Sequence, residues 1–112
     1  MPPESARYLR EMLDAVQTIE LHALGKSGDD YRQLRWLRDA VTWVFCVIGE
    51  ALSQLLKIDE TTGRRITESH KIVGLRNQLI HGYGVIDHDI TWKIVAEKLP
   101  ILHRELEELL AT

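Results

Sequence analysis

The sequence predicts an all-α fold, an up-and-down bundle of four helices. Apolar residues recur along the chain at intervals of three and four, the spacing that places them on one face of a helix. No run of β-branched residues alternates with polar ones in the way that indicates a strand. Because the chain has 112 residues, 45% of them hydrophobic and 28% charged, we expect one folded domain over residues 1–112.

The first predicted helix covers about residues 4–24, and Gly25 follows it as a natural stop. The inward positions of this helix are Leu9, Met12, Leu13, Val16, Ile19 and Ala23. Cap-type residues at 27–30 then begin a second helix. Since the apolar spacing is not interrupted, we expect this second helix to run unbroken to about Lys57.

The second helix is apolar on nearly every side between residues 40 and 52. A helix on the surface of a monomer needs only one apolar stripe. We therefore expect it to lie at the centre of the bundle or to be shared with a second subunit of a homodimer. Its charge-free part, residues 40–49, is far shorter than the ~20 residues that cross a bilayer, so no membrane association is expected.

A turn at about residues 58–63 leads to a third, shorter helix over about residues 67–80, which Gly82 and Gly84 end. The inward positions of the third helix are Ile72, Leu75 and Leu79. We therefore expect a short third helix that ends just before two glycines.

The last helix begins at Asp87 and Asp89, which can cap it. Its inward positions are Trp92, Val95, Ala96, Leu99, Leu102, Leu106, Leu109 and Leu110. Pro100 lacks the N–H of an internal hydrogen bond and should bend the helix. Because the apolar spacing continues through the proline, we expect one continuous helix.

The chain is acidic overall, with a formal net charge of -3, which argues against a protein that coats nucleic acid through bulk positive charge. Residues 64–81, which we call the basic segment, are an exception because they contain one acid, Glu68. The basic members of the segment are Arg64, Arg65, Lys71 and Arg76. Any contact with nucleic acid is therefore expected to be local and to involve this segment.

The lone cysteine, Cys46, excludes an internal disulfide, and its apolar surroundings predict a packed thiol. The Glu-x-x-His pair of ferritin-like carboxylate sites does not occur in the sequence, so we expect no metal site. The first residues lack the form of a signal peptide. These features together predict a soluble, cytoplasmic protein.

Residues able to do chemistry gather in the stretch Arg76-Asn77-Gln78-Leu79-Ile80-His81-Gly82-Tyr83. Positions 76 and 81 do not share a face of an ideal helix, so their convergence requires the helix to end near His81 and the reach of an arginine. Asn77 lies one turn before His81 and can touch it. An imidazole can take the proton of a ribose 2′-hydroxyl while a guanidinium neutralises charge on the phosphate. The pattern therefore suits RNA cleavage without metal or cofactor, in which Arg76 and His81 would be catalytic and Asn77 would support them.

A full acid–base cycle needs two groups, and the motif supplies one histidine. Two subunits related by a twofold axis would bring two copies of His81 to one cleft, which agrees with the all-round apolar second helix. A simpler interpretation is that His81 and Gly82 form a helix C-cap with a favourable charge from Arg76. The residues by themselves leave both interpretations open.

The pattern Arg76-x-x-x-x-His81-x-Tyr83, with Asn77 after the arginine, resembles the signature of HepT-like toxins of the HEPN superfamily. The resemblance extends to Val47-Ile48-Gly49-Glu50-Ala51, Gly74-Leu75, Gly84-Val85-Ile86-Asp87 and Lys98-Leu99-Pro100. It implies a homodimeric, metal-independent endoribonuclease toxin of a toxin–antitoxin system, with the active site in a shared cleft. It also implies an antitoxin, a minimal nucleotidyltransferase encoded alongside, that acts in trans by transferring AMP to Tyr83.

A second function class remains open, a non-catalytic helical dimerisation or adaptor module that uses the motif only to dock a nucleotidyltransferase. Glu50 lies on the apolar second helix, where an unpaired carboxylate is costly, so we expect it to have a partner such as a motif arginine. The three tryptophans, Trp36, Trp43 and Trp92, are expected in the core or at a dimer interface rather than stacked on bases.

Overall fold

A computed structural model describes residues 1–81 and 87–112 of the chain, without the side chain of His81. The predictions for Gly82, Tyr83 and Gly84 lie outside the described residues. Over the described ranges the chain forms seven α-helices and no strand. The all-α prediction is therefore confirmed, although the four expected helices are divided into seven.

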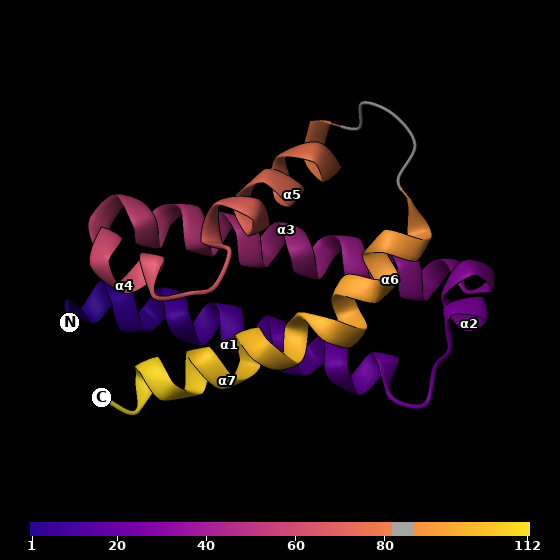
Figure 1. The fold of residues 1–112 in the computed structure, drawn as a ribbon, viewed down its shortest axis with the longest axis horizontal. Helices are drawn as coiled ribbons and strands as arrows, with labels where there is room; N and C mark the ends of the chain where they lie inside the picture. Colours follow the sequence, from indigo (N-terminus) through magenta and orange to yellow (C-terminus); the bar gives the residue numbers. More distant parts are fainter. Residues whose placement is uncertain (82–86) are drawn as a thin grey trace.

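Two long antiparallel helices, α1 (Pro3–Ala23) and α3 (Arg35–Ile58), lie side by side along the molecule (Figure 1). The other elements are α2 (Gly28–Gln33), α4 (Glu60–Arg64), α5 (Ser69–His81), α6 (His88–Glu97) and α7 (Leu99–Leu110). The chain runs up through α1, down through α3, up through α5 and down through α6 and α7. This order is the up-and-down arrangement that the sequence predicts.

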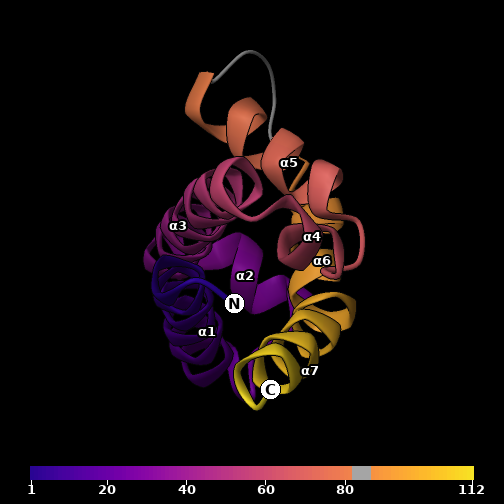
Figure 2. The same ribbon diagram turned by 90° about the vertical axis from the view of Figure 1, so that its left-hand side faces the viewer.

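The core lies between α1, α3 and the α6–α7 pair, which surround it when the molecule is viewed along its long axis (Figure 2). The largest fully buried side chains are Leu9, Met12, Val16, Ile19, Tyr31, Leu37, Val41, Ile48, Leu52, Leu55, Ile66 and Leu106. Helix α5 packs mainly against α3, and its last turns extend away from the bundle (Figures 1 and 2). The helix that carries the motif therefore lies outside the ring of helices that builds the core.

The prediction of one unbroken helix over residues 27–57 is wrong, because the chain adopts an extended conformation at Leu34, with φ -95° and ψ 97°. Ser27 and Asp30 form a capping box that begins α2. This short helix places the buried Tyr31 against Trp92 of α6, with ring centroids 5.2 Å apart. The break at Leu34 thus lets α2 reach α6 while α3 keeps its apolar side toward α1.

The prediction of one continuous last helix is also wrong, since α6 ends before Lys98 and α7 begins at Leu99. Pro100 lies in the first turn of α7, where the missing N–H has no helical partner to lose. Asp87 caps α6 as expected, accepting hydrogen bonds from the backbone N–H groups of Asp89 and Ile90. The proline therefore starts a helix instead of bending one.

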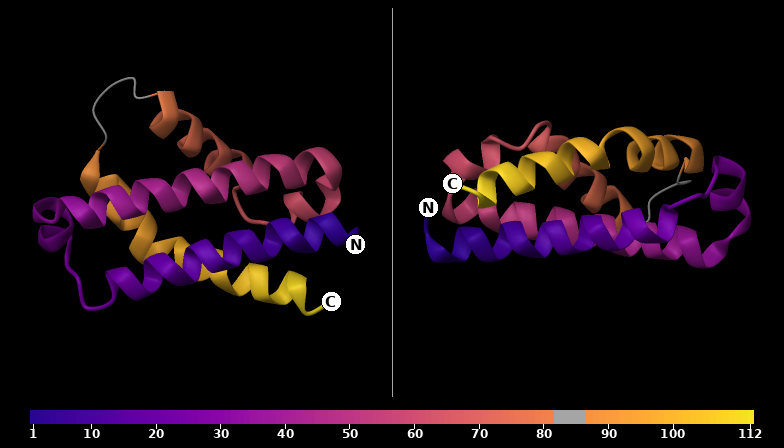
Figure 3. Two further views of the ribbon diagram at one scale, coloured as in Figure 1. Left: turned by 180° about the vertical axis from the view of Figure 1, so that it is seen from behind. Right: turned by 90° about the horizontal axis from the view of Figure 1, so that it is seen from below.

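The expected turn at residues 58–63 contains a helix, α4, whose N-cap is Asp59. The Asp59 carboxylate accepts hydrogen bonds from Thr62 of α4 and, at 2.9 Å, from the hydroxyl of Ser5 in α1. Ser5 is fully buried, so this contact joins the first helix to the end of the third. Viewed from behind, the two chain termini lie at this same end of the molecule (Figure 3).

By length and composition, α3 is the one helix in the described ranges that could cross a membrane. Its inner side is the centre of the hydrophobic core, where Leu37, Val41 and Leu52 have no solvent exposure. A core helix of a globular domain passes the same length and composition test. The apolar character of α3 is therefore explained in part by its packing against α1 and α5.

Candidate functional site

The site begins with a close approach of α5 to α3 at Gly49. A Cβ atom added at Gly49 would lie 2.2 Å from the Cβ of Arg76 and 2.7 Å from its Cγ. Real Cβ atoms do not come so close to other atoms, so only glycine at position 49 permits this packing. The base of the Arg76 side chain therefore rests directly on the α3 backbone.

Arg76 extends from that contact into a small polar network. Its Nη2 forms an ion pair with Oε2 of Glu50, and its Nη1 donates a hydrogen bond of 2.6 Å to Oδ1 of Asn77. The other carboxylate oxygen of Glu50 accepts a hydrogen bond of 3.1 Å from Gln54, one turn further along α3. The guanidinium is thus held from two sides, by α3 and by its own helix.

The predicted pairing of Glu50 with a motif arginine is confirmed. The reason expected for it, the cost of burying an unpaired carboxylate, is not the main one. The side chain of Glu50 is 50% exposed and that of Arg76 is 25% exposed. A half-exposed carboxylate keeps much of its hydration, so it does not need a partner to offset burial. The pair therefore positions the arginine more than it stabilises the fold.

The described part of the motif helix, α5, runs from Ser69 to His81. Asn77 is exposed and contacts Arg76, the residue before it. The side chain of His81 is outside the described part of the chain, and so is Tyr83. The convergence of Arg76 with His81, and the contact of Asn77 with His81, remain predictions.

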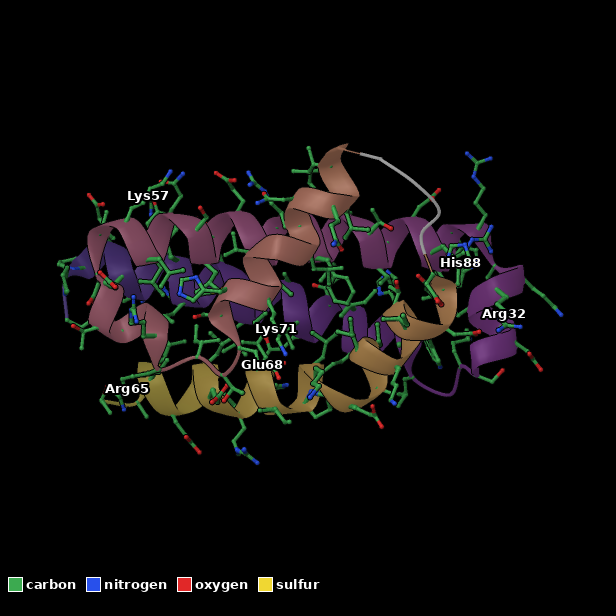
Figure 4. All side chains as sticks on the ribbon, turned by 45° about the horizontal axis from the view of Figure 1, so that its top comes forward. Arg32, Lys57, Arg65, Glu68, Lys71 and His88 are labelled. Atoms are coloured by element: carbon green, nitrogen blue, oxygen red, sulfur yellow. The ribbon has the colours of Figure 1, made fainter. Side chains whose placement is uncertain are left out.

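Acidic side chains lie beside most of the basic side chains of the basic segment. Arg64 pairs with Glu60 at 2.6 Å, and Lys71 lies 3.6 Å from Glu68. Figure 4 shows Lys71 beside Glu68 and Arg65 well apart from both. With Arg76 paired to Glu50, three of the four basic side chains of the segment lie beside an acidic side chain, while the excess of basic residues within the segment itself stands.

Cys46 lies one turn before Glu50 on α3 and is half-buried. Burial raises the pKa of the Cys46 thiol, and the nearby guanidinium of Arg76 opposes this effect more weakly. A raised pKa keeps the thiol protonated near neutral pH, so it packs as a small hydrophobe. This agrees with the prediction of a packed thiol.

The tryptophans divide into two groups. Trp92 is partly buried against Tyr31, as expected of a residue near the core. Trp36 and Trp43, by contrast, are 50% and 70% exposed on the outer side of α3, so the alternative of a place in the core is wrong for them. Trp43 and Glu50 are seven residues apart and share one face of the helix. Trp36 and Trp43 therefore form an exposed apolar stripe on the face of α3 that also carries Glu50, the partner of Arg76.

Sequence reasoning missed three features of this region. Gly49 and Gln54 are separated from the motif by more than twenty residues, and their roles depend on how α5 crosses α3. An apolar cleft of about 190 Å³ opens between α3, α5 and the α6–α7 pair, with Lys71 and Lys98 at its edge. Within the described ranges no three His, Cys, Asp or Glu side chains gather as metal ligands.

Comparisons with known proteins identify the family of the chain. The profile of the family described as "Ribonuclease HepT-like" matches residues 12–109. A "Putative RNase" of Methanocaldococcus jannaschii is 37% identical over 100 residues, which cover 89% of this chain and 91% of the relative. A "Probable ribonuclease HepT" of Thermococcus cleftensis is 28% identical over 102 residues, with 91% and 92% covered.

A third relative, the "Gamma-glutamylcyclotransferase and putative RNase" of Methanocaldococcus jannaschii, is 28% identical over 108 residues, and this chain spans 46% of its length. No solved structure matches the chain at a significant level. The family profile covers nearly the whole chain, and the relative at 37% identity is covered almost completely. By these matches the chain belongs to the HepT-like ribonuclease family.

Proposed function

We propose that this protein is a metal-independent endoribonuclease toxin of a toxin–antitoxin system, acting on RNA in the cytoplasm. The observation that carries the proposal is the position of Arg76 on α5, where Glu50 and Asn77 hold its guanidinium five residues before His81. A guanidinium fixed in this way can bind a phosphate and neutralise charge that develops on it. Family membership supports ribonuclease chemistry for this motif.

In the proposed reaction the His81 imidazole takes the proton from a ribose 2′-hydroxyl. The resulting 2′-oxygen attacks the adjacent phosphorus, and the 5′-oxygen of the next nucleotide leaves with a proton from a second acid. The products are a 2′,3′-cyclic phosphate and a free 5′-hydroxyl. The nucleophile belongs to the substrate, so the reaction requires no metal ion.

The second acid is proposed to be His81 of another copy of this chain in a homodimer. The exposed tryptophans Trp36 and Trp43 support this, because a stripe of large apolar side chains on a helix face favours a protein partner. The stripe lies on the same side of α3 as Glu50. A twofold contact along it would bring two motifs close to one axis.

Control of the toxin is proposed to depend on a nucleotidyltransferase antitoxin that transfers AMP to Tyr83. A phosphodiester two residues from His81 would compete for the Arg76 guanidinium and repel the RNA backbone. Co-expression with a neighbouring nucleotidyltransferase, followed by intact-mass measurement, should show AMP-sized additions that vanish in Tyr83→Phe. A neutralised toxin with unmodified Tyr83 would contradict this mode of control.

The central experiment incubates the purified chain with transfer RNA and messenger RNA in the presence of EDTA, and maps the product ends. Cleavage with cyclic-phosphate ends is expected, and Arg76→Ala and His81→Ala should abolish it without unfolding the bundle. Arg76→Lys should also fail, because an ammonium cannot reproduce the planar fork of a guanidinium. Arg104→Ala removes an exposed arginine paired with Glu108 on α7 and is the matched control.

Two results would contradict the proposal. A requirement for magnesium would exclude the mechanism that uses the 2′-hydroxyl without metal. An inactive wild-type dimer that binds a nucleotidyltransferase tightly would instead establish the alternative, a non-catalytic adaptor module.

A further inference from the structure

We infer that Glu50 is a positioning residue, which holds the Arg76 guanidinium so that one N–H on each terminal nitrogen is left for an RNA phosphate. The inference rests on the proposed ribonuclease function and adds a residue that lies outside the motif. It follows from counting the donors of Arg76 and from the way that the Glu50 carboxylate is itself fixed.

A guanidinium has five N–H donors, one on Nε and two on each terminal nitrogen. The Nε of Arg76 is buried and has no hydrogen-bond partner among the described residues. One donor of Nη2 is used by Glu50 and one donor of Nη1 by Asn77. Among the described residues, one donor on each terminal nitrogen therefore has no partner, which is enough for a two-point contact with a phosphate while Glu50 stays bound.

The carboxylate that directs the arginine is held in its turn. Gln54 donates to the Glu50 oxygen that Arg76 does not use, so both carboxylate oxygens have a partner. Gly49, the preceding residue, fixes the distance between the two helices at the base of the Arg76 side chain. Three residues of α3, Gly49, Glu50 and Gln54, thus define the position and the orientation of the Arg76 guanidinium.

The negative charge of Glu50 and its contact with Arg76 have opposite consequences for the reaction. The negative Glu50 lies next to the guanidinium that receives the phosphate, so it weakens the binding of RNA in the ground state. Its contact also restricts the rotation of the guanidinium, which favours the transition state. Removal of Glu50 should therefore lower kcat while KM stays unchanged or falls. A purely structural residue would not produce this combination.

The experiment compares Glu50→Gln and Glu50→Ala with the wild-type chain, using RNA cleavage in EDTA to obtain kcat and KM. Glu50→Gln keeps an acceptor without charge, and kcat should fall roughly tenfold; in Glu50→Ala it should fall roughly 100-fold. Glu108→Gln is the matched control, because Glu108 also pairs with an arginine, Arg104, on the exposed surface of α7. It should change neither constant.

A second measurement does not depend on activity. Burial protects the Nε–H of Arg76 from exchange with water, so its NMR signal should be visible near neutral pH and can be assigned by its loss in Arg76→Lys. The signal should shift or broaden in Glu50→Ala and stay unchanged in Glu108→Gln. A lowered kcat without a raised KM, together with the altered signal, is the expected result.

Unchanged kcat in both Glu50 variants, or an unchanged Arg76 signal in Glu50→Ala, would overturn the inference and leave the proposed function intact. A raised KM with normal kcat would also overturn it, because Glu50 would then contribute only to binding. If the wild-type chain cleaves no RNA, the proposed function fails. The Arg76 signal then decides by itself whether Glu50 orients this side chain.

Discussion

The inner and outer sides of α3 are both apolar but lie in opposite surroundings. On the inner side, Val41, Leu52 and Leu55 have no solvent exposure and pack within the core. On the outer side, Trp36 and Trp43 are largely exposed, and the stripe that they form ends at the Glu50–Arg76 pair. One helix therefore serves as the centre of the fold and as the support of the candidate site.

This difference shows that the all-round apolarity of α3 has two separate causes. Burial in the bundle accounts for the inner side, whereas Trp36, which lies beside His22 of α1, and Trp43 remain 50% and 70% exposed. Substitutions on the two sides should consequently have different effects. Inner positions should change the free energy of unfolding, whereas outer positions should change self-association and RNA cleavage.

The largest effect on stability is expected from Leu52→Ala on the inner side. Leu52 has no solvent exposure, and truncation of a buried leucine leaves a cavity that reduces the free energy of unfolding by roughly 2–5 kcal/mol. Urea denaturation followed by circular dichroism measures the change. A loss below about 1 kcal/mol would mean that this side of α3 is not the rigid core, because cavities in close-packed cores cost more.

Gly49→Ala tests the boundary between the two sides. Helix propensity alone would make alanine the more stable residue by about 1 kcal/mol, but the added Cβ would meet Arg76 at 2.2 Å. We expect a net loss of roughly 1–3 kcal/mol as α5 is displaced, and a loss of RNA cleavage with it.

Gly74→Ala is the matched control for that substitution. Gly74 also lies in a helix, and a Cβ added there meets no atom within 4 Å. It should stabilise the chain by up to about 1 kcal/mol. Equal effects of the two substitutions would show that the close contact with Arg76 does not exist in solution.

A smaller effect is expected at Asp59, where the inner side of α3 ends in polar contacts. Loss of this N-cap in Asp59→Ala should reduce the free energy of unfolding by about 1 kcal/mol at pH 7. The side-chain hydrogen bond from Thr62, and after it the one from Ser5, hold the pKa of Asp59 below its usual value. Urea denaturation of both chains at several pH values measures the difference.

The lowered pKa fixes the direction of the pH dependence. The unfolded chain binds a proton at Asp59 before the folded chain does, so the contribution is complete above about pH 4 and is lost as the pH falls through the lower folded pKa. The difference between wild type and Asp59→Ala should therefore be constant from pH 5 to 7 and shrink in stronger acid. A difference that grows on acidification would contradict this assignment.

The smallest effect on the folded protomer is expected from Trp43→Ser on the outer side. Exposed side chains contribute little, so the helix content should not change and the protomer should lose no more than about 0.5 kcal/mol. Light scattering at micromolar concentration should nevertheless report a dimer for wild type and a monomer for Trp43→Ser. Ile90→Ser removes another exposed apolar side chain, on α6, and should remain dimeric. A monomeric wild type would refute the proposed dimer.

The sequence by itself determined the all-α class, the inward positions of α1 and α7 and the cap at Asp87. These features depend on residues within a few turns of one another, and the spacing of apolar side chains along a helix encodes them directly. The motif was found in the same way, because Arg76, Asn77 and His81 are close in the chain.

Only the tertiary structure decided the features that join distant segments. The break at Leu34 depends on the contact of Tyr31 with Trp92, and the division at Lys98 puts Pro100 in a first turn where it is tolerated. Apolar spacing continues through both breaks, so a local pattern cannot reveal them. The pairing of Arg76 with Glu50 was expected from the cost of an unpaired carboxylate, whereas the contact of Arg76 with Gly49 depends on how α5 crosses α3. On a helix that is apolar all round, periodicity does not say which side is buried, and the packing of α1 and α5 against α3 settles that choice.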